Sequence, residues 1–350
     1  MKFKKNLLSI CLLLVLILTG CGSTNSKADI NKTIIRVGHN QSQKHPTHIG
    51  LLAFEKYIEE NLGDKYDVQV FPSELLGSQT DMVQLTQTGA INICVASNAI
   101  LETFDDVYEI FNLPYLFASA ESYHHVMDDP DITNPIFTST KDAGFQAVTW
   151  LDAGSRSFYT KNRPIKSAND LKGLKIRVQQ SPTNVKMMSL LGGSASPMGF
   201  GEVYTALQAG IIDGAENNEM SLTDNGHGDI CKYYSYDMHQ MVPDIVIANY
   251  EWLNDLPEDE RAIFEEGFKI LNQTQRKEWV TAVENAKEKA AKEQGVEFIY
   301  PDQSEFVEKV APLTQEVLQR NTKLQTYYDK IQEYNKEFPA QKEAKQWEKF

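Results

Sequence analysis

The sequence predicts an α/β protein in which two lobes each contain a sheet. Short β-branched runs alternate with amphipathic helical stretches, and this alternation stops and then resumes near residue 145. The chain beyond its N-terminal segment is about 320 residues long, which exceeds the size of one small core. The order strand, helix, strand, helix, strand predicts a parallel sheet with helices on its faces.

The elements expected in the first half are a strand over 34–39, a helix over 45–62, a strand over 66–71, a helix over 81–88 and a strand over 91–95. The first helix is predicted from apolar residues at helical spacing, namely Ile49, Leu52, Ala53, Tyr57 and Ile58. The stretch that follows, up to about residue 144, is expected to be rich in loops.

The elements expected in the second half are strands over 145–150, 157–159 and 174–178, helices over 183–191 and 202–209, a short strand after the turn at Asp213-Gly214, and a strand over 245–249. Pro257, followed by three acidic residues, is typical of a helix start, because proline fits the first turn and acids favour the positive end of the helix dipole. We expect this helix to run to Gln294. A short strand over 297–300 and a charged helical region from Gln303 onward follow.

The first twenty residues predict export. Lys2, Lys4 and Lys5 precede an apolar stretch over 7–18 that is too short to span a bilayer, which is typical of a secretory signal. The stretch ends in Leu-Thr-Gly-Cys21, which resembles the bacterial lipobox, where cleavage before the cysteine leaves its thiol carrying a diacylglycerol. An ordinary signal peptide with an incidental cysteine is the alternative.

We therefore assign residues 1–20 to a lipoprotein signal peptide and residues 21–33 to a flexible tether. The tether has almost no apolar residues to contribute to a core. Several acyl tails on Cys21 would hold the protein stably at a membrane surface, outside the cytoplasm.

The charge of the chain argues against nucleic acid as a partner. The formal net charge is −14, and loss of the three signal-peptide lysines lowers it to about −17. An anionic ligand would be repelled by this overall field, so any anion site must depend on a few local cations.

The cysteines predict two buried thiols. Cys11 is removed with the signal peptide, which leaves Cys94 and Cys231 in the mature body. Cys94 lies in an apolar run typical of a buried strand, so we favour two separate thiols over a disulfide.

The sequence lacks the common motifs of catalysis and metal binding. It contains no phosphate-binding loop, no HExxH, no GxSxG and no spaced set of cysteines. His45 and His48 are close in sequence, but a third ligand is missing. We therefore expect no metal, no cofactor and no enzymatic activity.

Two arginines are candidates for binding a carboxylate. In the strand over 174–178, Leu174, Ile176 and Val178 share one face, and Arg177 lies on the other, near the carboxyl end where α/β lobes bind ligands. An arginine fork can make two parallel hydrogen bonds to a carboxylate, each contributing about 1.5–3 kcal/mol. Arg156 is the second candidate. A surface arginine or an ion pair between lobes remains the alternative.

Several motifs together resemble one family. These are GSR at 154–156, DLKGLKIRV at 170–178, PMGFGEVYTALQAG at 197–210 and DGAEN at 213–217. In this order they resemble the solute-binding proteins of tripartite ATP-independent periplasmic (TRAP) transporters, of the DctP type. The resemblance extends from about residue 34 to the region of 253–257.

The resemblance implies a two-lobed fold like that of periplasmic binding proteins, with a hinge and long C-terminal helices. Lobe I would comprise residues 34–153 plus about 243–282. Lobe II would comprise residues 154–242 plus about 283–340.

The resemblance also implies roles for residues of lobe II. Arg177 would make a double hydrogen bond to the ligand carboxylate, Arg156 would support it, and Asn217 would orient the pair. Phe200 would pack against the ligand. This chain has Asn218 where the family usually has a proline.

In lobe I, the resemblance implies that Asn40, Gln79, Ser97 and Asn98 face the rest of the solute. All four are neutral hydrogen-bonding residues. A second carboxylate on the ligand would call for another cation in this wall. The set therefore favours a hexuronate or another sugar acid over a C4-dicarboxylate, with a sialic acid as a further alternative.

The function expected from the resemblance is capture of a small organic acid by closure of the lobes, followed by delivery to the integral membrane subunits of a TRAP transporter. Two other functions are alternatives. A lipid-anchored hydrolase would use Glu216 or Asp213 as a base, and a surface adhesin would have no small ligand.

Overall fold

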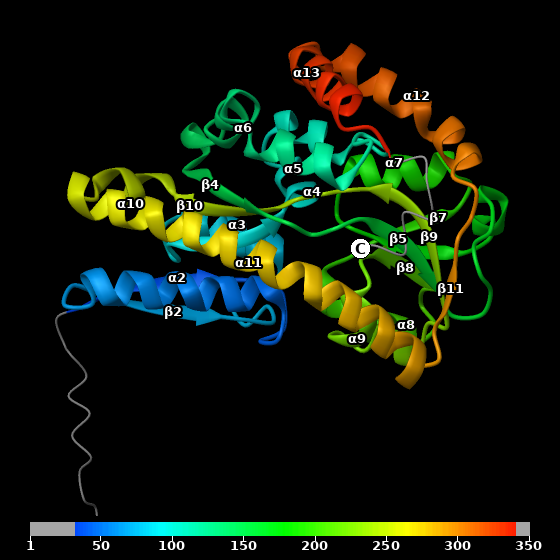
Figure 1. Ribbon diagram of the computed structural model, residues 1–350, viewed down its shortest axis with the longest axis horizontal. Coiled ribbons are helices and arrows are strands. Elements are labelled where there is room, and N and C mark those ends of the chain that lie inside the picture. Colours follow the sequence, from blue (N-terminus) through cyan, green and yellow to red (C-terminus); the bar gives the residue numbers. More distant parts are fainter. Residues whose placement is uncertain (1–31, 341–350) are drawn as a thin grey trace, which may run out of the picture. The chain divides into compact units, whose positions relative to one another are not determined.

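The computed structural model describes residues 32–340, so the predicted signal peptide, Cys21 and most of the tether lie outside the described residues. The chain from Ile34 onward forms one unit, whose strands are arranged in two sheets (Figure 1). Within residues 32–340, no helix has the length and apolar character needed to cross a membrane.

Sheet A defines lobe I and has the strand order β2-β1-β3-β10-β4. Its strands are β1 (Thr33–Gly38), β2 (Tyr66–Phe71), β3 (Ile93–Ser97), β4 (Phe145–Leu151) and β10 (Asp244–Asn249). β1 and β3 are parallel, as predicted, but β10 is antiparallel to both β3 and β4. The prediction of a parallel sheet covered only the first three strands, and it left open the direction of β10, which enters directly from lobe II without a crossover helix.

Helix α2 (Pro46–Leu62) has the predicted bounds but buries a different face. Leu51, Phe54 and Ile58 are fully buried, whereas Ile49 and Leu52, assigned to the apolar face from sequence, are exposed. The buried face packs against the long helix α11 (Glu258–Glu293). Gly267 of α11 permits this close approach, because a Cβ there would lie 3.0 Å from Ile58 and from Phe54.

The stretch expected to be rich in loops is largely helical. It contains α4 (Asn98–Leu101), η1 (Asp106–Asn112), α5 (Ala120–Asp128), α6 (Pro130–Phe137) and η2 (Lys141–Ala143); α3 (Gln79–Gln87) precedes it. The longest of the helices within the stretch has nine residues, which is too short for a clear helical period. Capping side chains mark their starts, such as Ser119 before α5 and Asp129 before α6.

Sheet B defines lobe II and has the order β11-β9-β5-β8-β6-β7. Its strands are β5 (Arg156–Thr160), β6 (Lys175–Val178), β7 (Ser194–Pro197), β8 (Gly214–Asn217), β9 (Tyr233–Gln240) and β11 (Glu297–Ile299). The predicted core face of β6 is confirmed for Ile176 and Val178, which are fully buried; on the other face Lys175 is exposed, but Arg177 is buried. β7 and β9 were not predicted.

The helices of lobe II are short. They are η3 (Ala168–Leu171), α7 (Pro182–Leu190), η4 (Phe200–Glu202), α8 (Val203–Gln208), α9 (Met220–Thr223) and η5 (His227–Asp229). The helix expected over 202–209 is present as α8, and η4 directly precedes it. Cys231 of this lobe and Cys94 of lobe I are both buried and free, which confirms the prediction of two separate thiols.

Three segments pass between the lobes. Residues 152–155 join β4 to β5, residues 241–243 join β9 to β10, and α11 contacts α2 and β4 of lobe I as well as α9 of lobe II. α11 follows α10 (Tyr250–Asp255) and begins directly after Pro257, as predicted. Figure 1 shows it in gold, running from beside α2 toward α8 and α9.

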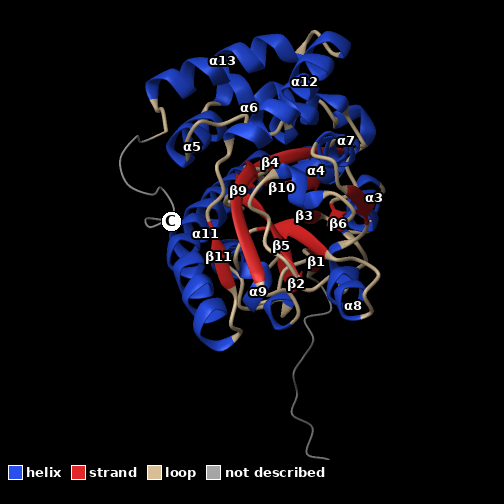
Figure 2. Ribbon diagram, turned by 90° about the vertical axis from the view of Figure 1, so that its right-hand side faces the viewer, coloured by secondary structure: helices blue, strands red, loops and turns tan. Residues whose placement is uncertain are grey.

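The C-terminal helices contact both lobes. α12 (Ser304–Arg320) packs on α7, and α13 (Leu324–Glu337) packs on α5 and η1. Figure 2 shows both helices on the same side of the strands as α5, α6 and α7. The charged helical region predicted from Gln303 onward is thus confirmed.

His45 provides a test of the fold through pH. It caps α2 by accepting a hydrogen bond from the Thr47 amide (3.2 Å), and burial lowers its pKa to about 3. Because the unfolded chain binds a proton near pH 6.5 and the folded chain does not, this group makes the protein less stable as the pH falls below 6.5. At pH 5, the protonation of His45 in the unfolded chain should lower the free energy of unfolding by about 2 kcal/mol.

The variant His45→Asn keeps a capping oxygen but cannot titrate. Denaturant unfolding at pH 7 and pH 5 should therefore show that wild type loses about 2 kcal/mol more than the variant. Equal losses in the two proteins would mean that His45 is not held neutral in the folded state.

Candidate ligand-binding site

Arg177, near the end of β6, is a buried cation that is bonded to a neutral group. Its Nε and Nη2 atoms donate to the carbonyl oxygen of Met198 at 3.1 and 2.8 Å, and its guanidinium lies 5.7 Å from the ring centre of Phe200. The side chain is 4% exposed. Among residues 32–340, no carboxylate oxygen lies within 4.0 Å of the Arg177 guanidinium nitrogens, the limit for an ion pair. The third nitrogen, Nη1, does not take part in the hydrogen bonds to Met198.

Arg156, the first residue of β5, is neutralised by an acid. Its Nε donates to the Glu216 carboxylate at 2.5 Å, and its Nη2 donates to the Glu216 carbonyl at 2.8 Å. Its Nη1 donates to Oδ1 of Asn217 at 3.0 Å. Asn217 thus contacts one member of the arginine pair that it was predicted to orient, and the structure shows no hydrogen bond from Arg177 to it.

Arg156 is held in place by a row of side chains with alternating charges, namely Glu216, His239 and Asp237. Burial opposes ionisation of Glu216, yet the charge of Arg156 and the nearby His239 outweigh it and hold the pKa of Glu216 at about 2. His239 lies 3.5 Å from Glu216 and 2.8 Å from Asp237. Burial alone would lower the pKa of His239, but the two acids raise it to about 9. A carboxylate held in this way is a poor general base, which counts against the hydrolase.

The register of three strands brings the two arginines to the same part of sheet B. β8 lies between β5 and β6, Ser157 pairs with Asn217, and Arg177 pairs with Ala215. Ala215 and Asn217 are two residues apart, so their side chains share one face of β8. The arginines therefore flank a strand that itself contributes Asn217.

The residues predicted from lobe I form two groups. Gln79, the first residue of α3, accepts a hydrogen bond from the Ser97 amide at 2.6 Å, which places it beside the end of β3. Asn98 points its amide nitrogen into η1, where it donates to Tyr108 and Asn112 at 2.8 and 2.9 Å. Only Oδ1 of Asn98 is left without a partner among the described residues. Asn40 follows β1 and is 8% exposed.

Two acids near the arginines were missed by the sequence analysis. Glu74 accepts a hydrogen bond from the Gly201 amide at 3.1 Å; burial raises its pKa, and this amide and the charge of Arg177 oppose the rise. Asp244 pairs with Ser97 across β3 and β10, and burial raises its pKa to about 6 against the charge of Arg156. No local motif marks either acid, since each lies far in sequence from its arginine.

Asn218, the departure from the family pattern, links β8 to a connection between the lobes. Its Nδ2 donates to the carbonyl of Ala153 at 3.2 Å, and its Oδ1 accepts from the Met220 amide at 3.1 Å. A proline at 218 would supply neither side-chain bond. The substitution therefore ties the end of the Asn217 strand to the β4–β5 connection.

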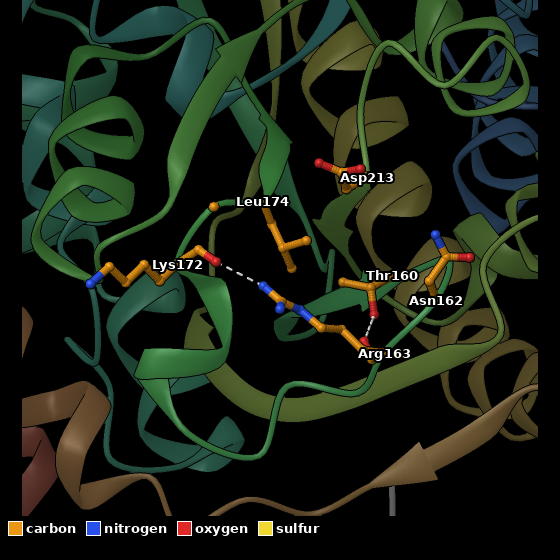
Figure 3. Close-up of a pocket in the computed structure, with 7 residues that line it drawn as sticks. Thr160, Asn162, Arg163, Lys172, Leu174 and Asp213 are labelled. Atoms are coloured by element: carbon orange, nitrogen blue, oxygen red, sulfur yellow. Dashed lines mark hydrogen bonds between the residues drawn. The ribbon is translucent and has the colours of Figure 1, made fainter.

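A cavity of about 350 Å³ lies elsewhere on lobe II (Figure 3). Arg163 and Lys172 line it, and the Arg163 side chain donates to the Lys172 carbonyl at 2.8 Å. Thr160, at the far end of β5 from Arg156, also lines it, so the cavity is about 13 Å from the arginine site along the strand. Among residues 32–340, no cluster of three metal-ligating side chains is found.

The row of alternating charges predicts a large cost for removing Glu216. In Glu216→Gln, Arg156 would remain buried without an opposite charge, so the free energy of unfolding should fall by about 3–5 kcal/mol. Glu202→Gln, at an exposed position, is the matched control and should change it by less than about 0.5 kcal/mol. Chemical denaturation measures both, and an equally small effect of the two substitutions would refute the buried ion pair.

Comparison with known proteins places the chain in a family. The model of the DctP family, bacterial extracellular solute-binding protein family 7, matches residues 37–321. The protein YiiZ of Salmonella typhimurium is 39% identical over 310 residues, which cover 89% of this chain and 94% of that protein.

Two solved structures are similar throughout their length. A TRAP periplasmic solute-binding protein from Anaerococcus prevotii, with bound alpha/beta D-glucuronate, is 78% identical, with a TM-score of 0.88 and coverage of 88% of this chain and 100% of that chain. One from Xanthobacter autotrophicus, with bound beta-D-galacturonate, is 32% identical, with a TM-score of 0.82 and coverage of 85% and 98%. The chain therefore belongs to the DctP family of bacterial extracellular solute-binding proteins.

Proposed function

We propose that this solute-binding protein captures a hexuronate, such as D-glucuronate or D-galacturonate, for a TRAP transporter, and that Arg177 binds the carboxylate of the sugar acid. The observation that carries the proposal is the buried guanidinium of Arg177, whose hydrogen bonds go to the neutral Met198 carbonyl. Burial disfavours this cation, and Glu216 and Glu74 oppose that effect only from beyond ion-pair distance, so Arg177 lacks an opposite charge in direct contact. A carboxylate on Nη1 and Nη2 would supply that charge in a geometry suited to arginine.

The other residues of lobe II support this role of Arg177. Arg156 is neutralised by Glu216, so it adds hydrogen-bond donors and rigidity rather than a second uncompensated charge. Phe200 lies against the guanidinium of Arg177, in a position to pack on the ring of a sugar. Asn217 holds Arg156 in place beside it.

The wall from lobe I favours hydroxyl groups over a second carboxylate. Asn40, Gln79, Ser97 and Asn98 are neutral, and Glu74 and Asp244 add acids near the two arginines. Carboxylates and amide oxygens accept hydrogen bonds from hydroxyls, whereas a second carboxylate on the solute would meet like charges. A C4-dicarboxylate is therefore disfavoured. The bound glucuronate and galacturonate of the two solved relatives support the same class of solute.

Binding is proposed to close the lobes. In this proposal, lobe I comprises residues 34–153 plus about 243–282, and lobe II comprises residues 154–242 plus about 283–340. The connections at 152–155 and 241–243, together with α11, form the hinge. Closure removes water from the site, which strengthens each polar contact with the solute. The closed form is then recognised by the integral membrane subunits of the transporter, and no reaction on the solute is involved.

The ligand assignment is tested by thermal shift and calorimetry with D-glucuronate, D-galacturonate, succinate and N-acetylneuraminate. A hexuronate should raise the melting temperature, because it binds the folded state alone. Arg177→Ala should remove this shift, and Arg177→Lys, which lacks the planar fork, should weaken binding at least about tenfold. Arg163→Ala removes an exposed arginine outside the site and should bind as wild type. Retained binding in Arg177→Ala would refute the site, and a preference for succinate would refute the solute class.

We also propose that Cys21 is lipidated after removal of residues 1–20, so that the protein is anchored at the outer face of a membrane through the tether 21–33. The LTGC sequence at 18–21 supports this proposal. The full chain, produced in a bacterium fed with a palmitate analogue, should become labelled and remain with the membrane fraction. Cys21→Ala should be unlabelled; label on that variant, or none on wild type, would refute the anchor.

A further inference from the structure

A turn in lobe I holds an acidic residue in a strained backbone conformation. Ser73 and Glu74 have φ values of 55° and 58°, in the left-handed region that residues other than glycine rarely adopt. The amide of Ser73 donates to the Gln41 carbonyl at 3.0 Å, and that of Glu74 donates to the His39 carbonyl at 3.1 Å. These two bonds fix Glu74 beside Asn40, and such over-determined strain is typical of functional positions.

The carboxylate of Glu74 reaches across to lobe II. Its Oε2 accepts a hydrogen bond from the Gly201 amide at 3.1 Å, next to Phe200. A Cβ on residue 201 would lie 2.4 Å from Oε2, so the Glu74 carboxylate would have to move away. The second oxygen, Oε1, is buried and has no partner among the described residues.

We propose that Glu74 is a clasp that couples closure of the lobes to the solute. Its Oε2 holds the Gly201 amide of lobe II, and its Oε1 accepts a hydrogen bond from a hydroxyl of the bound sugar acid. This inference rests on the proposed function and adds to it a contact that neither the arginines nor the neutral wall supplies. A solute hydroxyl satisfies the buried oxygen, so the closed form is most stable when the solute is present.

Binding of D-glucuronate tests the clasp through a double-mutant cycle. Glu74→Ala loses both bonds and should weaken binding about tenfold, mainly through faster dissociation. Gly201→Ala should also weaken binding, because its methyl group displaces the carboxylate. In the double variant the methyl group has no carboxylate to displace, so the affinity should equal that of Glu74→Ala alone.

Matched controls separate the clasp from general damage. Gly199→Ala lies in the same segment, and its Cβ would be 4.0 Å from the nearest side chain, so it should bind as wild type. Glu74→Gln keeps an oxygen for the Gly201 amide and should lose less affinity than Glu74→Ala. Melting temperatures of all variants should lie close to that of wild type. Unchanged affinity in Glu74→Ala, or independent effects that multiply in the double variant, would overturn the clasp.

Hydrogen exchange at the Gly201 amide tests the clasp without relying on the identity of the solute. In the ligand-free protein, Glu74→Ala should speed this exchange about tenfold, and added D-glucuronate should slow it in wild type alone. A difference in this exchange rate between wild type and Glu74→Ala that appears only with D-glucuronate also supports the clasp. Equal exchange in both proteins under both conditions would overturn it. If wild type does not bind D-glucuronate, the proposed solute is wrong, and the exchange in the free protein still decides the clasp.

Discussion

The arrangement of two buried arginines beside one short strand is the constraint on which the site depends. Arg156 is neutralised by Glu216, which also lies 3.5 Å from His239, and Asp237 pairs in turn with His239. Arg177 is equally buried, but its hydrogen bonds go to a carbonyl group. One arginine with an acid in direct contact and one without therefore lie side by side, and the proposed binding of an organic anion rests on this difference.

This local arrangement explains how an anion can bind to a chain with a formal charge of −14. The long-range field is unfavourable and screened by salt within about 10 Å, whereas the proposed contact with Arg177 would be made at hydrogen-bond distance in a buried environment. The acids Glu74 and Asp244 lie near the arginines, but among residues 32–340 neither forms an ion pair with Arg177. They limit the positive charge to one place, which suits a solute with one carboxylate and several hydroxyls.

The fold positions the site through connections that pass twice between the sheets. β4 leads into β5, which begins with Arg156, and β9 leads back into β10, which begins with Asp244. Each crossing therefore delivers a charged residue at the point where the lobes meet. Asn218 fastens the strand of Asn217 to the first crossing, and Glu74 meets Gly201 across the lobes. Motion at the crossings thus acts directly on the groups proposed to contact the solute.

The sequence by itself determined the features that depend on local patterns: the α/β class, the bounds of α2 and β2, the long helix after Pro257, the core face of β6, and the motifs that contain Arg156, Arg177 and Asn217. It failed for the short helices between 98 and 143, which have capping residues but are too short to show a helical period. It left open the direction of β10, which depends on the other lobe. Only the tertiary structure decided which arginine is neutralised and that Glu74 lies against Gly201, because these contacts join residues 60 and 127 positions apart. Periodicity describes one element at a time, and it carries no information about charges that meet only when the chain returns from another lobe.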